Sequence, residues 1–263
     1  MTIVSLKDKV SQEEWAVRVE LASAYRAAFE MGYELSIFGH ISARVPGEPD
    51  ALLLNPFGLA FDEITASSLV KVDKNRKILT ENGYELNQAG FNLHSGIMFT
   101  SPHINAIIHA HTLDGAAVGA MKGGFQPLTQ DGAMVYPKVR YLDYDGIVVL
   151  PGEGEASAKA LGPDGRVLIL KNHGTLSVGA TMGEAFFYFY FFEKACSIQV
   201  RALANPAGVQ PISQKIMSEM PAEEQVVLKG LTKLAEPHEQ TPYDDIFAGF
   251  MRRAKRRYPD VDA

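Results

Sequence analysis

Two histidines, His109 and His111, lie two positions apart in the apolar segment 106–111, whose sequence is AIIHAH. A β-branched segment of this kind is typical of a strand, in which alternate side chains point to the same face of the sheet. Two neutral imidazoles on one face can bind a divalent cation such as Zn²⁺. A third histidine, His173, ends another apolar segment and precedes Gly174, which lets the chain turn there. The pattern indicates a three-histidine metal site, with half-buried histidines in ordinary polar contacts as the alternative.

The elements that must position these histidines alternate along the chain. Helices are expected at 12–31, 88–101, 113–121, 155–161, 182–204 and 212–235, and strands at 41–45, 51–54, 104–111, 147–150 and 166–171. Ser11 and Asn87 can cap the first two helices, because their side chains accept backbone hydrogen bonds, and Pro102 ends the second. Strands mixed with helices favour one α/β domain over residues 1–235, followed by a C-terminal extension at 236–263 with a surface helix and a loose tail.

Composition narrows the class of protein. The 263 residues are 46% hydrophobic and 21% charged, which is typical of a globular protein and argues against disorder. The net charge of −6 argues against a nucleic-acid-binding protein, so the basic cluster at 252–257 is expected to be a solvated face. The aromatic run 186–192 is too short to span a membrane and is expected in the core or a subunit interface. A single cysteine, Cys196, and the absence of an apolar signal region predict a cytoplasmic protein.

Seven segments of the chain resemble the class II aldolase/adducin family, in that family's order and spacing. They are GHISARV (39–45), LNPFG (54–58), EITASSLVKV (63–72), NQAGFNLHS (87–95), IHAHT (108–112), LILKNHG (168–174) and EKACSIQV (193–200). The resemblance covers about residues 13–204. Within the seven segments, the residues are more similar to those of the adducin head than to those of the sugar-phosphate aldolases. It implies a three-layer α/β/α fold around a central, largely antiparallel sheet. It also implies a homotetramer with active sites near the subunit interfaces.

The resemblance also implies a metal centre. Family aldolases bind Zn²⁺ through three histidines, and these map onto His109, His111 and His173. In that chemistry the metal polarises the carbonyl and hydroxyl oxygens of the substrate. Zn²⁺ is therefore expected here, while Mn²⁺ or another divalent ion remains an alternative because three imidazoles do not select between them.

The chain departs from the family aldolases at functional positions. The acid/base glutamate that family aldolases carry one turn before the histidine matching His94 is replaced here by Gly90. Family residues that bind the substrate phosphate are replaced by His40, by Gln88 with its neighbouring alanine, and by Phe57. A phosphate dianion would lose several hydrogen-bond donors at these positions. We therefore expect the substrate not to be a sugar phosphate.

Five polar side chains are candidates for binding or converting the substrate. We expect His40, Asn55 and Gln88 to bind it, because the resemblance places them in the same pocket with neutral or titratable donors. His94 and Asp131 are the candidate catalytic groups, and Asp131 lies close to where family aldolases place a catalytic tyrosine. For His40 and His94, structural hydrogen bonding beneath the sheet is an equal alternative.

The leading hypothesis is a divalent-metal-dependent lyase that cleaves a C–C bond, in the aldol manner, in a small non-phosphorylated carbonyl or hydroxy acid substrate. One alternative is a metal-dependent decarboxylase of a hydroxylated aromatic acid, a reaction of some relatives, for which Phe57 would offer an apolar wall. The other is a non-catalytic, adducin-like oligomeric interaction module. The expected partners are a small-molecule substrate and other copies of the chain, with no nucleic acid and no membrane. Tyr243 or Tyr258 is a further candidate to reach a neighbouring subunit's site, as tail residues do in some family aldolases.

Overall fold

The computed structural model describes residues 5–146, 152–220 and 242–263, and a seven-stranded mixed sheet forms its centre. The strands are β1 (His40–Val45), β2 (Glu48–Leu54), β3 (Val70–Asp73), β4 (Ala106–Ala110), β5 (Val139–Leu142), β6 (Val167–Leu170) and β7 (Gly174–Gly179). Their order across the sheet is β3-β2-β1-β4-β7-β6-β5. Only β5 and β6 pair in parallel; the other neighbouring pairs are antiparallel.

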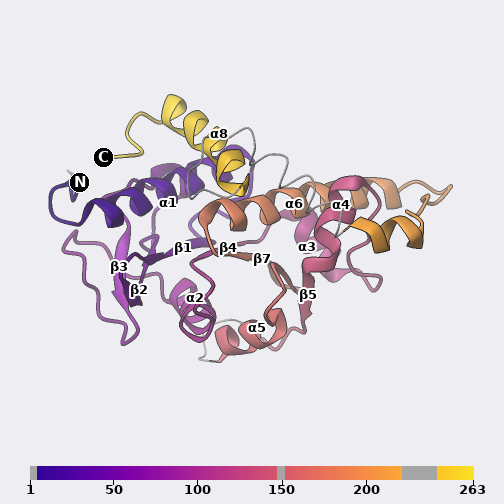
Figure 1. Cartoon of the computed structure of the whole chain (residues 1–263), viewed down its shortest axis with the longest axis horizontal. Coiled ribbons are helices and arrows are strands. Elements are labelled where there is room, and N and C mark those ends of the chain that lie inside the picture. Colours follow the sequence, from indigo (N-terminus) through magenta and orange to yellow (C-terminus); the bar gives the residue numbers. More distant parts are fainter. Residues whose placement is uncertain (1–4, 147–151, 221–241) are drawn as a thin grey trace.

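Helices cover both faces of the sheet (Figure 1). On one face lie α1 (Gln12–Glu30), α3 (Leu113–Ala120), α4 (Gln130–Val135), α6 (Met182–Leu203) and α8 (Pro242–Arg257). On the other face lie α2 (Gln88–Thr100) and α5 (Glu153–Leu161). The structure also contains two short 3₁₀ helices, η1 (Phe61–Glu63) and η2 (Tyr136–Lys138). The prediction of a three-layer α/β/α fold with a largely antiparallel sheet is confirmed.

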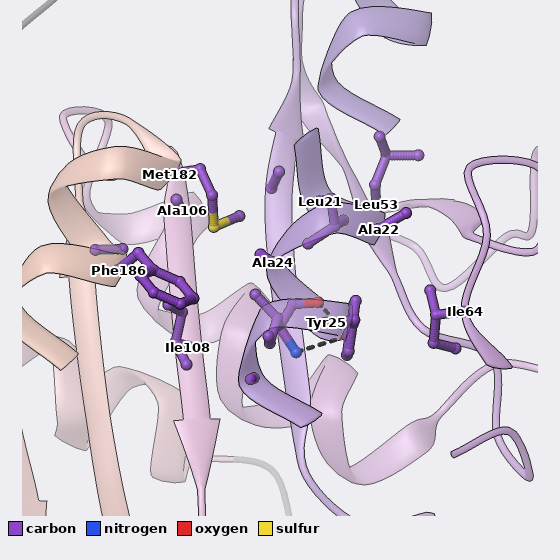
Figure 2. Close-up of a cluster of buried hydrophobic side chains, with 14 of the residues drawn as sticks. Leu21, Ala22, Ala24, Tyr25, Leu53, Ile64, Ala106, Ile108, Met182 and Phe186 are labelled. Atoms are coloured by element: carbon purple, nitrogen blue, oxygen red, sulfur yellow. Dashed lines mark hydrogen bonds between the residues drawn. The ribbon is translucent and has the colours of Figure 1, made fainter. Parts of the chain in front are cut away.

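The alternation of side chains along β4 decides which layer receives the histidines. Ile108 packs in the core between the sheet and helices α1 and α6, where Figure 2 shows it beside Phe186. Ile107 packs on the opposite face, in the core against α2 and α5. His109 has the parity of Ile107, so it points into the layer that contains α2. On the neighbouring strand β1, Ile41 belongs to the first core, which places the flanking His40 and Ser42 on the side of α2 as well.

A buried tyrosine of α1, Tyr25, contacts both the beginning of β1 and the residue that directly follows β2. The Tyr25 hydroxyl lies 2.5 Å from the Ile41 carbonyl oxygen and 2.8 Å from the side-chain oxygen of Asn55. The same hydroxyl accepts a hydrogen bond from the Ile41 backbone N–H at 2.6 Å (Figure 2). This contact fixes the first residues of β1, and His40 with them, against the helix.

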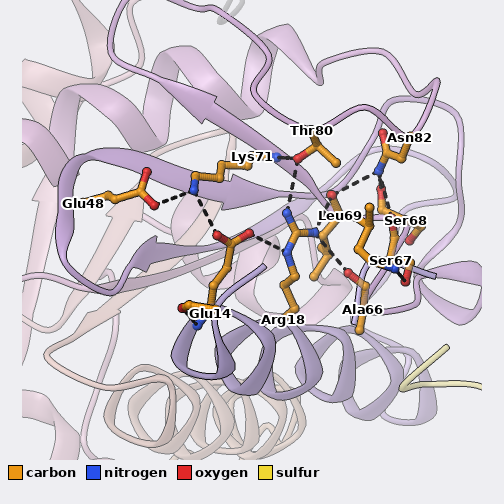
Figure 3. A network of polar contacts seen from close by, with 12 residues as sticks. Glu14, Arg18, Glu48, Ala66, Ser67, Ser68, Leu69, Lys71, Thr80 and Asn82 are labelled. Atoms are coloured by element: carbon orange, nitrogen blue, oxygen red, sulfur yellow. Dashed lines mark hydrogen bonds and ion pairs between the residues drawn. The ribbon is translucent and has the colours of Figure 1, made fainter. Parts of the chain in front are cut away.

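A second buried polar network ties α1 to β3 and the loop before it (Figure 3). Arg18 donates to the Glu14 carboxylate at 2.8 Å and to the carbonyl oxygens of Ala66 and Leu69. Lys71 of β3 donates to the other oxygen of the same carboxylate at 2.9 Å. The Arg18 side chain is only 1% exposed, so these partners are what make its burial tolerable.

The predicted helices and strands agree with the structure at most positions. Helices predicted at 12–31, 88–101, 113–121, 155–161 and 182–204 are observed with ends shifted by at most two residues. Of the helix predicted at 212–235, residues 214–220 are helical and the rest lies outside the described residues, as does the strand predicted at 147–150. Strands β3, β5 and β7 were not predicted from the sequence. These strands are only four to six residues long and mix apolar with polar or small residues, and pairing within the sheet stabilises them.

The C-terminal segment does not form a loose tail, so this expectation is wrong. Phe247 of α8 and Val261 beyond it are each 1% exposed and belong to the same hydrophobic core as α1 and α6. The carbonyl oxygen of Val261 also accepts a hydrogen bond from the Ala66 backbone N–H. The helix is amphipathic, so its apolar face is buried while its basic side chains stay outside. The exposed basic residues are Arg252, Arg253, Lys255, Arg256 and Arg257, as predicted.

The aromatic run 186–192 lies within α6, and most of its side chains are buried in the hydrophobic cores. The core assignment of this run is therefore confirmed. In the parts of the chain that the structure describes, no helix is both long enough and apolar enough to cross a membrane.

Candidate metal centre

The fold brings His109, His111 and His173 together. His109 is in β4, His111 follows that strand directly, and His173 lies in the turn that connects β6 to β7. Because β4 and β7 are paired neighbours, the end of one strand meets the beginning of the other. The turn depends on Asn172, which adopts a left-handed backbone conformation with φ of 57°. One nitrogen from each ring lies within 4.8 Å of the corresponding nitrogens of the other two rings.

The hydrogen bonding of His109 leaves the lone pair of its Nε2 available to bind a metal. Its Nδ1 lies 3.0 Å from the Thr175 carbonyl oxygen, which can only accept, so Nδ1 carries the proton. The other ring nitrogen, Nε2, lies 3.1 Å from Nε2 of His111. Two nitrogens bound to one tetrahedral Zn²⁺ are roughly 3.3 Å apart, given bonds of about 2.0–2.1 Å. The separation and the donor types therefore fit a divalent metal held by imidazoles.

Burial keeps the rings of His109 and His111 neutral. The pKa of His109 lies well below its usual range, because burial disfavours the charged imidazolium and the neighbouring histidines add to the effect. Burial, together with the nearby His173, lowers the pKa of His111 to about 4. A neutral imidazole has a free lone pair, so neither ring must release a proton before it binds a metal near neutral pH.

A carboxylate that the sequence did not single out stands behind the third histidine. Oε1 of Glu153, the first residue of α5, lies 3.6 Å from Nδ1 of His173. The other oxygen of Glu153 is buried and has no hydrogen-bond partner among the described residues. A carboxylate beside the second nitrogen of a ligand histidine is a common arrangement in metal sites, where it orients the ring. In the sequence Glu153 resembles any acidic residue near a helix start, so no pattern distinguished it.

The three histidines open into a cavity of about 700 Å³. Its wall includes the aromatic side chains of Phe38, Phe57 and Tyr144, each more than half exposed, of which the sequence singled out only Phe57. No described lining residue is Lys, Arg, Asp or Glu. The lining residues are Phe38, Gly39, His40, Phe57, Leu86, Asn87, Gln88, Ala89, Leu93, His109, His111, Tyr144, Gly146, Asn172 and His173.

His40 and His94 form a pair in which only the first lines the cavity. Nδ1 of His40 lies 2.9 Å from Nε2 of His94, and Nδ1 of His94 lies 2.6 Å from the Ser42 hydroxyl. The His40 ring also stacks on His109, with ring centroids 4.9 Å apart. His94 is completely buried, and burial holds the pKa of both paired histidines well below the usual range. The structure thus places His94, a predicted catalytic residue, behind His40.

The space beside His40 accounts for Gly90. A Cβ at position 90 would lie 2.9 Å from Cγ of His40, closer than real Cβ contacts come. The glycine at position 90 and the histidine at position 40 both depart from the aldolase pattern. The structure connects these two departures, because the His40 ring fills the volume that a side chain at position 90 would need.

Of the remaining predicted site residues, one lines the cavity and two do not. Gln88 lines the cavity, as expected for a substrate-binding residue. Asn55 does not line it; its side chain is fully buried and contacts the Tyr25 hydroxyl. Asp131 lies on α4, outside the cavity lining, and forms an ion pair of 3.4 Å with Lys194.

The two tyrosines that were candidates for a neighbouring site make contacts within this chain. Tyr243 packs on Phe187 of α6, with ring centroids 4.9 Å apart. The Tyr258 hydroxyl donates a hydrogen bond to Glu30 at 3.2 Å, and its ring lies under the Arg26 guanidinium. Both side chains therefore help to attach the C-terminal segment to the body of the fold.

Comparison with known proteins identifies the family. Residues 19–200 match the family model described as the class II aldolase and adducin N-terminal domain. The chain belongs to this family, as the motifs at its histidines predicted.

Relatives within the family include both aldolase-type proteins and adducins. A Caulobacter vibrioides protein that carries the provisional name aldolase class 2 protein is 45% identical over 201 residues, covering 76% of this chain and 78% of that protein. Rat alpha-adducin (Rattus norvegicus) is also 45% identical, over 197 residues that cover 74% of this chain but only 27% of the adducin. Among solved structures, an aldolase II superfamily protein from Pseudomonas syringae superposes with a TM-score of 0.87 at 35% identity, covering 99% of this chain and 100% of that one. The L-fuculose 1-phosphate aldolase from Glaciozyma antarctica superposes with a TM-score of 0.76 at 28% identity, covering 99% and 95%.

Proposed function

We propose that the protein is a divalent-metal-dependent lyase that cleaves a C–C bond in a small, non-phosphorylated carbonyl or hydroxy acid substrate. The observation that carries the proposal is the convergence of three imidazole nitrogens at a cavity whose described lining contains no charged side chain. His109, His111 and His173 are the proposed ligands, with Zn²⁺ as the expected ion. Such an ion supplies Lewis-acid polarisation of a substrate oxygen, which stabilises the negative charge that develops when a C–C bond breaks.

His40 is the proposed substrate-facing polar group of the chain. Its ring lines the cavity next to His109, and its Nδ1 is engaged by His94, so Nε2 is the nitrogen left to bind a substrate oxygen. His94 acts through His40, because its own ring is fully buried and held by Ser42. We therefore assign His94 a positioning role in place of direct contact with the substrate.

Two further polar residues complete the proposal. Gln88 offers a side-chain amide to the substrate from the first residue of α2. Asp131 lies outside the cavity of its own chain, so a catalytic role for it requires the cavity of another subunit. Such an arrangement would exist in the homotetramer that we propose for the protein in the cytoplasm.

The proposed substrate class rests on the lining of the cavity. Proteins bind phosphate dianions mainly through charged or backbone donors, of which arginine and lysine are the strongest. Neither residue is present in the described lining, whereas three exposed aromatic rings are. By its name the Glaciozyma antarctica relative is an aldolase for a sugar phosphate, so we propose that this chain differs from it in substrate.

The aromatic lining also favours a second reaction at the same site. Phe38, Phe57 and Tyr144 could contact a flat ring, which suits decarboxylation of a hydroxylated aromatic acid. The 45% identity to alpha-adducin favours a non-catalytic interaction module as a different class of function. The convergent histidines argue against that module, because an interaction surface does not require three imidazole nitrogens within 4.8 Å of one another.

Metal analysis tests the proposal first. Protein purified without added metal should contain close to one divalent ion per chain, and His111→Ala or His173→Ala should remove it. Protein that contains almost no metal, and is unchanged by chelation and by His109→Ala, would overturn the metalloenzyme proposal. The loaded protein would then be incubated with aldols, with their phosphorylated counterparts and with hydroxylated aromatic acids. Release of an aldehyde supports the aldol reaction, and release of carbon dioxide supports decarboxylation.

A further inference from the structure

A buried carboxylate on α6 lies outside the cavity and is not used by the proposed reaction. Glu193 is only 2% exposed and is not among the residues that line the cavity. Its Oε1 accepts a hydrogen bond of 2.5 Å from the Thr175 hydroxyl, and its Oε2 accepts a short one from the Thr112 hydroxyl. No described basic side chain forms an ion pair with it. Burial raises the pKa of this carboxyl group to about 7.

The two threonines belong to the two segments that carry the histidines. Thr112 follows His111 directly, and Thr175 stands two residues after His173. The carbonyl oxygen of Thr175 also accepts the hydrogen bond from Nδ1 of His109. One carboxylate therefore connects the end of β4 to the beginning of β7, through a threonine next to His111 and another that is two residues from His173 and hydrogen-bonded to His109.

The carboxylate of Glu193 packs closely against the first turn of α3. A Cβ at Gly115 would lie 2.6 Å from Oε1 of Glu193, so a side chain there would displace the carboxylate. Thr112 is the N-cap of α3, and its hydroxyl accepts a hydrogen bond of 3.2 Å from the Gly115 backbone N–H. The partial positive charge of this helix end favours an acidic partner for the cap.

From these contacts we infer that Glu193 is a positioning residue for the three-histidine centre, which it acts on through Thr112 and Thr175. By holding both hydroxyls, it fixes the separation between the His-Ala-His segment and the turn that carries His173. The inference rests on the proposed function, because it takes the three histidines to be metal ligands. Residues in the second layer around metal ligands commonly change metal affinity by about 10–100-fold when they are altered.

The test measures metal affinity by competition with a chromophoric chelator, using Zn²⁺ and the whole chain. Glu193→Gln keeps the size of the side chain but replaces one acceptor oxygen with an NH₂ donor, which leaves a threonine hydroxyl without its acceptor. We expect its Zn²⁺ affinity to fall by about 10–100-fold. Its Co²⁺ absorption spectrum should differ from that of the unaltered protein, because the spectrum reports the geometry of the ligands.

A matched control separates positioning from general stability. Asp114 of α3 joins the same two helices, because it accepts hydrogen bonds from Ser197 and Arg201 of α6, but it does not contact the threonines. Asp114→Asn should change stability while leaving the Zn²⁺ affinity and the Co²⁺ spectrum unaltered. An equal loss of affinity in this control would overturn the inference, as would an affinity of Glu193→Gln equal to that of the unaltered protein.

A second pair of variants applies if Glu193→Gln fails to fold. Thr175→Val removes one hydroxyl from the carboxylate and should weaken Zn²⁺ binding, while Thr175→Ser retains the hydroxyl and should bind nearly normally. Equal affinities of these two variants would overturn the inference. The two proposals fail in different ways: an unaltered protein without metal affinity contradicts the proposed function and the inference that depends on it, whereas normal affinity in the variants contradicts the inference alone.

Discussion

Gly96 of α2 and Gly154 of α5 touch so closely that neither position could hold a side chain. A Cβ at Gly96 would lie 2.6 Å from Cα of Gly154, and a Cβ at Gly154 would lie 2.6 Å from the Leu93 carbonyl oxygen. This crossing sets the first turn of α5 directly against α2. Glu153, which stands beside His173, is the residue immediately before the contact, so the crossing also determines where its carboxylate lies.

We first predict that Gly154→Ala destabilises the protein and weakens metal binding. The added methyl group would meet backbone atoms, so α5 must move away from α2, at a cost of about 1–3 kcal/mol in the free energy of unfolding. Urea denaturation measures the first effect and chelator competition the second. Gly123→Ala is the control, because its methyl group would meet only the end of the Gln126 side chain, at 3.2 Å. Normal stability of Gly154→Ala would contradict the close crossing.

A second prediction concerns Gly90 and His40, which compete for one volume. Gly90→Ala should destabilise the unaltered protein, because its Cβ would collide with the His40 ring. In a His40→Ala background the same substitution should cost little, since the ring is gone. Urea denaturation of the four proteins in this cycle should give a coupling energy of about 0.5–3 kcal/mol. Additive effects would show that the His40 ring does not fill this space.

Our third prediction concerns the orientation of His173. Glu153→Gln retains the shape of the side chain but removes the negative charge beside Nδ1 of His173, so metal affinity should decrease by about 10–100-fold. Chelator competition measures the change. Glu155→Gln is the matched control, because Glu155 lies in the same first turn of α5 and is exposed. Equal affinities in the two variants would exclude an orienting role for Glu153.

The fourth prediction is a pH dependence of stability that arises far from the histidines. Burial, and repulsion from Asp244, raise the pKa of Glu20 on α1 to about 7, from a usual value of 4.5. Because the folded state holds this proton more tightly than the unfolded state, the contribution of Glu20 to stability is present below the unfolded pKa and is lost as the pH rises through about 7. Glu20→Gln cannot lose a proton, so it should stabilise the protein at a pH near 8 relative to a pH near 5, by at most about 3 kcal/mol.

Urea denaturation of the unaltered protein and Glu20→Gln at the two pH values measures this difference. The exposed Glu81 supplies the control, because Glu81→Gln should change stability by the same small amount at both pH values. A Glu20→Gln effect that is also independent of pH would contradict the raised pKa.

The motifs that resemble the family predicted the three layers of the fold, and they singled out the three histidines that the fold brings together. The sequence could not predict which of His40 and His94 lines the cavity, since that follows from how α2 packs on β1. It likewise missed Glu153 and Glu193. Each contributes through a partner that lies 18 or more residues away, so no local pattern sets it apart from other glutamates.

The basic residues of the C-terminal helix were also recognised from the sequence, but its apolar face was not. The sequence of α8 contains five basic residues near its end, which suggested a solvated segment, but the apolar residues before them, together with Ala254, decide where it packs. Phe247 and Ala254 are each 1% exposed because they fall on one side of the helix.

The packing of α8 on α1 has a consequence for how the chain reaches its native state. The ion pair between Arg26 and Asp260 joins residues 234 positions apart, and Phe247 shares one core with Leu21 and Ala24. During synthesis α1 emerges long before α8, so part of its apolar face must wait, uncovered, until nearly every other described element has been made. Contacts of such long range slow folding, because a large loop must close before they contribute. We therefore expect the packing of α8 on α1 to be the last step of folding, with the apolar face of α1 as the surface that chaperones would recognise before then.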